Sequence, residues 1–302
     1  MSVRGGSPGG NLVSAVLVAA LLAAPCALAA PTTPSGQAVQ ATPTVPTANV
    51  QAAPAVQAAP AVQVAPTAPT AATVQAVPGA PVPTVDEIVG GYVAARGGIQ
   101  KLRSLRTLRE EGRVSAGQGR DGLVTREIKR PGRIRVEFTA QGVTEVFASD
   151  GKHGWKVTPL EGAKGPQPLP DDEVADAREN ADLDGPLVDW KSKGNQVELV
   201  GREAVDGQDA YKLKITLKSG GTLTAYLDVK SMHLVRTEAD RKLRGRMVKI
   251  ERTFGDFRKT DGILFPHLVE IRTSGRPQVF RVVVDKVELN PPLSDARFAP
   301  PT

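Results

Sequence analysis

The chain has 302 residues, with 38 lysines and arginines, 32 aspartates and glutamates, and a formal net charge of +6. It contains one cysteine, which excludes an intramolecular disulfide framework. All but one of the basic residues and all of the acidic residues lie from Thr84 onward. This charged region, 84–302, is long enough to form one domain with a sizeable core.

Residues 1–29 have the pattern of a cleaved secretory signal peptide. A positive charge at Arg4 precedes the apolar run Leu12–Ala24, and Ala27-Leu28-Ala29 supplies the small residues that signal peptidase recognises. The run is shorter than the roughly 20 residues that a membrane span needs, so an uncleaved anchor is the less favoured alternative. Lipidation of Cys26 is another alternative. We therefore expect an exported protein.

Residues 30–83 form an Ala-, Pro- and Val-rich segment without a charged or aromatic residue, in which QAAPAV-like hexads begin at Gln51, Gln57 and Gln63. Such a segment has nothing large to bury and cannot offset its ordering entropy. We expect an extended, disordered tether, whose contour at about 3.1 Å per residue would approach roughly 160 Å. The alternative is a spacer without a role in function.

A helix is predicted at the start of the charged region. Thr84 and Glu87 have the spacing of a capping box. Behind them, apolar residues recur on one helical face, and Gly97-Gly98 is a typical stop signal. A short second helical turn is expected at 99–102.

The period then changes from about 3.6 to 2, which indicates strands. Arg133–Ala140 and Tyr211–Lys218 alternate between apolar and charged residues, and Asp-Gly pairs such as Asp206-Gly207 separate similar runs at hairpin intervals. We expect ten or eleven strands in antiparallel meander order. The fold class is α+β, mainly antiparallel β, with the sheet curled into a barrel or half-barrel.

An acidic helical segment interrupts the strands at 169–194. Asp171 or Asp172 is positioned to cap a helix in which Val174, Ala177 and Ala181 share a face. After Asp184-Gly185-Pro186, a second helical turn is expected to align Leu183, Leu187 and Trp190 at i, i+4 and i+7. These apolar stripes either cover a ligand-binding face of the sheet or plug the end of a filled barrel.

Five blocks of the charged region occur in an order that resembles the outer membrane lipoprotein-sorting protein family, which belongs to the superfamily of periplasmic lipoprotein carriers and related receptors. The resemblance covers nearly all of 84–302, and its blocks are DGKHGWKV (150–157), ADLDGPLVDWKSKG (181–194), VELVGREAVDGQDAYKLKITLKSG (197–220), FGDFRKTDGILFPHLVEI (254–271) and KVELNPPLSDARF (286–298).

This resemblance implies an unclosed β-barrel of about eleven strands, helices over its mouth, and a hydrophobic cavity for acyl chains that needs no cofactor. It also implies a strand arginine that fastens the lid, but the many strand arginines leave its position open. Large apolar residues on the strands or the lid are the candidate cavity liners, with an ordinary core role as the alternative for each: Phe138, Phe147, Trp155, Leu183, Leu187, Trp190 and Tyr226.

Catalytic and metal sites are not indicated. His153, His233 and His267 are far apart in the sequence and have no zinc-site spacing, and there is no nucleophile elbow, P-loop or dinucleotide fingerprint. The acidic pairs Glu110-Glu111 and Asp171-Asp172 are interpreted as solvated surface, because neighbouring side chains do not face each other on a helix or a strand. The sequence favours a binding protein over an enzyme.

The expected function is therefore a periplasmic carrier for acylated lipoprotein or lipid. Its partners would be inner- and outer-membrane transfer proteins, with transient membrane contact and no nucleic acid. One alternative is a sensor or receptor tethered to a membrane and facing the periplasm. Another is a module that binds anionic envelope components through the basic stretches 126–135 and 240–259. In the latter case, binding would weaken with salt, because ionic strength screens exposed charges.

Overall fold

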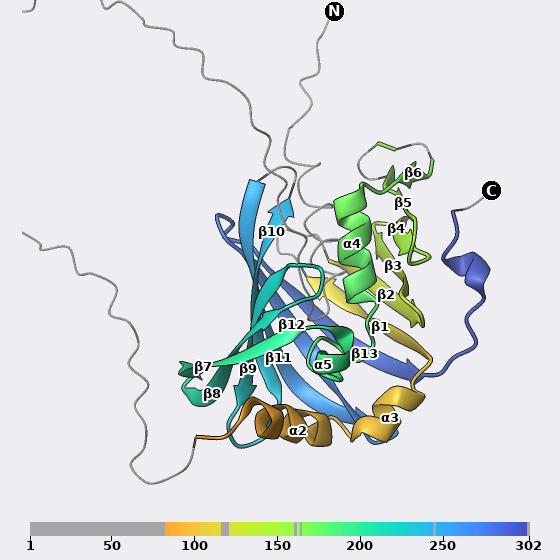
Figure 1. The fold of residues 1–302 in the computed structure, drawn as a ribbon. Helices are drawn as coiled ribbons and strands as arrows, with labels where there is room; N and C mark the ends of the chain where they lie inside the picture. The colour runs from red at the N-terminus through yellow and green to blue at the C-terminus, as the bar shows by residue number, and fades with distance from the viewer. Residues whose placement is uncertain (1–81, 116–120, 160–161, 164, 244–245, 301–302) are drawn as a thin grey trace, which may run out of the picture. The chain divides into compact units, whose positions relative to one another are not determined.

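A computed structural model describes residues 82–115, 121–159, 162–163, 165–243 and 246–300 (Figure 1). The expected signal peptide and all but the last two residues of the expected tether (30–83) lie outside the described residues. The strands form one sheet and are β1 Thr107–Ser115, β2 Gly122–Lys129, β3 Arg133–Ala140, β4 Val143–Ser149, β5 Gly154–Val157, β6 Gln167–Pro168, β7 Gln196–Val205, β8 Gln208–Thr216, β9 Thr222–Asp228, β10 Leu234–Leu243, β11 Arg246–Thr260, β12 Ile263–Thr273 and β13 Val279–Leu289. The helices are α2 Val85–Ala95, α3 Ile99–Ser104, α4 Asp171–Asn180, α5 Trp190–Lys193 and the short 3₁₀ helix η2 Asp295–Arg297.

The sheet is antiparallel throughout, and its strand order is β6-β5-β4-β3-β2-β1-β13-β12-β11-β10-β9-β8-β7. Neighbours in the chain are neighbours in the sheet, except that β1 pairs with β13, with Leu108 opposite Leu289. That pairing places β6 and β7 at the two ends of the sheet although they are consecutive in the chain. The expected α+β fold with an unclosed, mainly antiparallel barrel is confirmed.

Alternating side chains give the sheet a buried inner face, which carries the core, and a charged outer face. In β3, Ile134, Val136 and Phe138 are buried while the residues between them are partly exposed. Asp206-Gly207 adopts the positive φ angles of a tight turn, as its sequence predicts. The described residues contain thirteen strands instead of ten or eleven. Short strands such as β5 and β6 show too few residues to reveal alternation.

Helix α2 is the predicted N-terminal helix. The side chain of Thr84 accepts a hydrogen bond from the Glu87 amide, and Glu87 Oε2 accepts one from the Thr84 amide at 2.7 Å. Both halves of the capping box are therefore present. The apolar stripe of the helix is buried at Ile88, Val89 and Tyr92. The helix thus packs one face into the core.

The segment 169–195 joins β6 to β7, and we call it the crossing segment. Its first helix, α4, buries Val174 and Ala177 as predicted, but its N-cap position is Pro170 and no aspartate side chain caps it. The predicted helix through 183–190 is wrong: α5 begins only at Trp190. Gly185 precedes a proline and has a φ of 74°, which breaks a right-handed helix at that point.

Helix α4 lies between two distant parts of the sheet (Figure 1), and polar contacts hold it there. On one side, Arg178 Nε donates to the Gly151 carbonyl, which lies between β4 and β5, at 2.9 Å. On the other side, Arg241 of β10 lies 3.2 Å from Asp176, and Ser219 donates to Glu179 Oε1 at 2.8 Å. Helix α4 therefore bridges the first and second halves of the open sheet.

Burial raises the pKa of Glu179 from 4.5 to about 7, and this effect outweighs the hydrogen bond from Ser219 and the charge of Arg241. Burial also raises the pKa of Asp176. The folded state thus holds the Glu179 proton more tightly than the unfolded chain does. The stabilisation is complete below about pH 4.5 and is lost as the pH rises through 7.

We expect Glu179→Gln to flatten the pH dependence of stability between pH 5 and pH 8. The natural chain should lose up to about 3 kcal/mol of unfolding free energy over this range, because tenfold in proton affinity is worth roughly 1.4 kcal/mol. Asp176 should leave a smaller residual slope. Urea unfolding at both pH values measures the effect, with the more exposed Glu173→Gln on the same helix as the control. Equal slopes for natural chain and Glu179→Gln would contradict the assignment.

Candidate ligand-binding cavity

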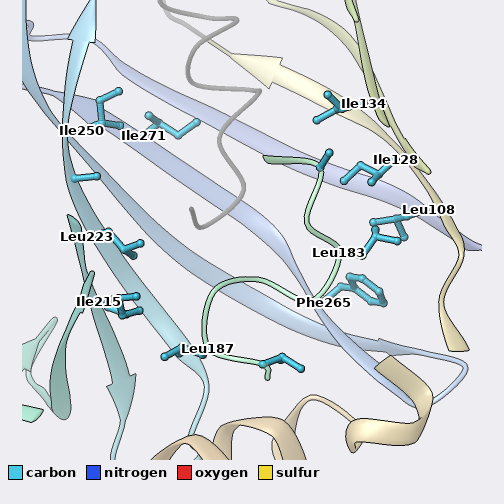
Figure 2. Packing of buried hydrophobic residues seen from close by; sticks show 14 of the residues in the cluster. Leu108, Ile128, Ile134, Leu183, Leu187, Ile215, Leu223, Ile250, Phe265 and Ile271 are labelled. Carbon is cyan, nitrogen blue, oxygen red and sulfur yellow. The ribbon is translucent and has the colours of Figure 1, made fainter. Parts of the chain in front are cut away.

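A cavity of about 160 Å³ lies against the inner face of the sheet. Its walls are mainly apolar and come from both halves of the sheet. Figure 2 shows Leu183 of the crossing segment close to Leu108 and Phe265, and all three line the cavity. The other apolar side chains that line it are Tyr92, Val124, Ile128, Leu234, Phe254, Phe257, Leu264, Pro266, Val269, Ile271, Val282 and Val284.

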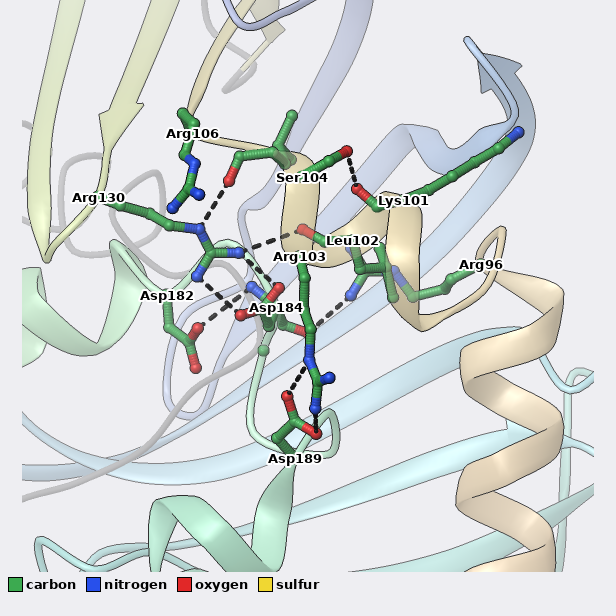
Figure 3. Close-up of polar contacts among 12 residues, drawn as sticks. Arg96, Lys101, Leu102, Arg103, Ser104, Arg106, Arg130, Asp182, Asp184 and Asp189 are labelled. Carbon is green, nitrogen blue, oxygen red and sulfur yellow. Dashed lines mark hydrogen bonds and ion pairs between the residues drawn. The ribbon is translucent and has the colours of Figure 1, made fainter.

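The crossing segment covers this cavity, and Asp184 fastens it to the sheet (Figure 3). Arg130, which directly follows β2, donates two hydrogen bonds to the Asp184 carboxylate, at 2.8 and 2.6 Å. The same guanidinium donates to the Leu105 carbonyl at 2.7 Å. The backbone carbonyl of Asp184 accepts a further hydrogen bond of 2.7 Å from Arg96, the C-cap residue of α2. One aspartate thus connects the cover to a strand end and to a helix.

The bidentate contact with Asp184 raises the pKa of the Arg130 guanidinium, so this ion pair persists throughout the physiological pH range. A second, more exposed pair lies further along the segment, where Arg103 of α3 contacts Asp189 at 2.7 Å. These contacts are polar, whereas the surface beneath them is apolar. The crossing segment is thus held both by ion pairs and by the buried apolar side chains of Leu183, Leu187 and Val188.

Four of the seven predicted cavity liners belong to the main core. Leu183 lines the cavity itself. Leu187, Phe138 and Phe147 are buried in the surrounding core cluster but do not line the cavity. Trp190 is partly buried and packs against the same cluster. Ligand contact by these residues remains a prediction.

The structure places Trp155 and Tyr226 on the outer face. Trp155 Nε1 donates to the Phe298 carbonyl at 3.0 Å, beneath the C-terminal segment. Tyr226 packs in a separate small cluster with Val205 and Ala210. Strand alternation explains this placement, because the neighbours of Tyr226, Ala225 and Leu227, belong to the main core. Size and apolarity alone do not identify the face of a strand.

Sequence reasoning missed a charged pair in the cavity wall. Glu110 of β1 and Arg126 of β2 lie opposite each other and line the cavity. The interpretation of Glu110 as solvated surface is therefore wrong. The spacing along β1 was the available signal. Glu110 is an even number of residues from the buried Leu108 and Val114, so its side chain lies on the same face of the strand.

The three histidines occupy separate environments. His233 lines the cavity edge with its ring 4.6 Å from that of Phe257, and burial lowers its pKa, so it is neutral at pH 7. His267 is buried with Nδ1 at 2.7 Å from the Val284 carbonyl, and His153 is exposed. Across the described residues, no group of three His, Cys, Asp or Glu side chains could hold a metal ion. None of the helices in those residues is long and apolar enough to cross a membrane.

No protein-family model matches the chain, and no curated protein matches it either. Among solved structures, it is similar to a DUF1329 family protein from Desulfovibrio piger, with a TM-score of 0.51, 16% identity, and coverage of 71% of this chain and 97% of that chain. A LolA superfamily protein from Nitrosomonas europaea matches with a TM-score of 0.47, 15% identity, and coverage of 72% and 98%. A domain from Vibrio parahaemolyticus, named for outer membrane lipoprotein sorting, matches with a TM-score of 0.46, 12% identity, and coverage of 71% and 97%. The likeness to the Desulfovibrio piger protein shows that the two chains share a fold.

Proposed function

We propose that this protein binds the acyl chains of lipid or lipoprotein in the cavity beneath the crossing segment. The observation that carries the proposal is an apolar cavity on the inner face of an open sheet, closed by a segment that polar contacts fasten. Each buried CH₂ group contributes about 0.8 kcal/mol. An acyl chain supplies many such groups without any need for catalysis or a cofactor.

Ligand entry requires the crossing segment to move. The resting cavity of about 160 Å³ is smaller than the roughly 300–1,000 Å³ of sites that enclose drug-sized ligands. A long acyl chain therefore needs additional space, which displacement of Leu183 would provide. In this proposal, Arg130 acts as the arginine that fastens the lid, and exchange of its contact with Asp184 opens the cavity.

The biological setting that we propose is the periplasm, reached through a cleaved signal peptide. There the protein would carry acylated cargo toward the outer membrane. Release would occur when a partner or membrane offers the acyl chain equal apolar burial. This carrier role unites the exported N-terminal pattern, the apolar cavity and the movable cover in one cycle.

We expect Val269→Glu to weaken binding of a fluorescent fatty-acyl probe at least about tenfold, which corresponds to about 1.4 kcal/mol. Val269 is partly buried and lines the cavity, so the new carboxylate would lie in the space that the acyl chain fills. Fluorescence titration of the full chain measures the affinity. Leu123→Glu is the control, because Leu123 is 62% exposed. Unchanged binding by a folded Val269→Glu protein would refute the cavity assignment.

We also expect Arg130→Met to accelerate uptake of the same probe several-fold while lowering stability by about 1–3 kcal/mol, since Asp184 would lose its main partner. The double variant Arg130→Met with Asp184→Leu should recover part of that stability and retain fast uptake. Stopped-flow fluorescence and urea unfolding measure the two quantities. Reduced stability with unchanged uptake would show that the pair does not control access.

A further inference from the structure

The cavity wall contains one ion pair within its apolar surroundings. Arg126 Nε donates to Glu110 Oε2 at 2.6 Å, and the side chains are only 19% and 12% exposed. The neighbouring cross-strand pairs, Leu108 with Ile128 and Gly112 with Val124, line the same cavity. The pair therefore belongs to the inner face and not to the charged outer face.

Both residues line the cavity, and each keeps a polar atom without a hydrogen bond among the described residues. Two contacts join the side chains. Nε and Nη2 of Arg126 each contact the same oxygen, Oε2 of Glu110. Within the part of the chain that the structure describes, Oε1 of Glu110 and Nη1 of Arg126 make no other hydrogen bond. One acceptor and one donor of the cavity wall are thus available to a ligand, and polar groups in apolar surroundings are stabilised by such partners.

Two other charged groups of the cavity wall, Arg96 and Asp182, are already engaged in hydrogen bonds. Arg96 donates to the Asp184 carbonyl, and Asp182 accepts a hydrogen bond from Lys193 at 2.5 Å. Glu111, the next residue of β1, acts electrostatically on Lys286 of β13. The Glu110–Arg126 pair is itself neutral overall. A ligand with a net charge would place an uncompensated charge in this apolar space, which is strongly unfavourable.

We propose that the Glu110–Arg126 pair is the polar head site of the cavity and selects acyl ligands with an uncharged head that both donates and accepts hydrogen bonds. Amides and hydroxyl-bearing esters have this chemistry: the N–H or O–H donates to Glu110, and the C=O accepts from Arg126. The acyl chain then extends along the apolar wall formed by Phe265, Val269 and Ile271. This inference rests on the proposed acyl-binding function and specifies the ligand class.

The test compares probes with hydrocarbon chains of closely matched length but different heads. Isothermal titration calorimetry on the full chain measures their affinities. We expect lauramide and monolaurin to bind about tenfold more tightly than laurate or dodecylammonium, since only the first two match both groups without adding a charge. Methyl laurate, which has an acceptor but no donor, should have an affinity between those of the two uncharged donor probes and those of the two charged probes. Tightest binding by laurate would overturn the inference in favour of an anion site.

The decisive variant replaces both partners, Glu110→Leu with Arg126→Met, because an apolar replacement of similar size avoids an unpaired buried charge and preserves folding. This variant should bind lauramide no more tightly than methyl laurate, because neither ligand then has a polar partner in this part of the wall. The control removes an exposed pair on the outer face, Arg113→Met with Asp285→Leu, and should keep the preference.

The possible failures are distinguishable. Equal affinity of the natural chain for all five probes would refute the head site and leave the acyl cavity intact. Absence of binding by any probe would refute the proposed function itself. A lauramide preference that survives in the double variant would place the head site elsewhere.

Discussion

The connection between β6 and β7 is the constraint on which the rest of the structure depends. These strands are consecutive in the chain but form the two edges of the sheet, because β1 pairs with β13 in its middle. The residues between them must therefore cross the open inner face. A cover over the cavity is a consequence of this topology, and the sequence of the crossing segment determines how tightly that cover is held.

Two different forces hold the crossing segment against the sheet. Apolar burial is large and non-directional, so the position of Leu183 against Phe265 and Leu108 has little angular specificity. The ion pair of Arg130 with Asp184 is directional and bidentate, and it fixes where the segment lies. A ligand that replaces the apolar contacts of Leu183 leaves most of the core unchanged. The proposed opening of the cavity would therefore be local and would not require global unfolding.

Local patterns predicted the elements of this fold well, and long-range contacts poorly. Alternation identified the inner face of β3, and a capping box identified the start of α2, because both signals lie within a few residues. The contact between Arg130 and Asp184 joins residues 54 positions apart, and nothing in either local sequence distinguishes that arginine from its neighbours. The helix expected at 183–190 failed because regular apolar spacing was given more weight than the break at Gly185.

Glu110 shows why the cavity is more than an apolar space. Replacing a buried ion pair with apolar residues of similar size is often neutral or stabilising, so folding stability does not account for a charged pair at the centre of an apolar wall. The pairs on either side of it along β1 and β2, Leu108 with Ile128 and Gly112 with Val124, are apolar or small, as the inner face requires. In the head-site proposal, the pair supplies direction instead, because it gives a mainly apolar wall a donor and an acceptor. An amphiphile bound there would have a defined orientation, and in the proposed cycle that orientation would determine which end leaves first once the contact between Arg130 and Asp184 is exchanged.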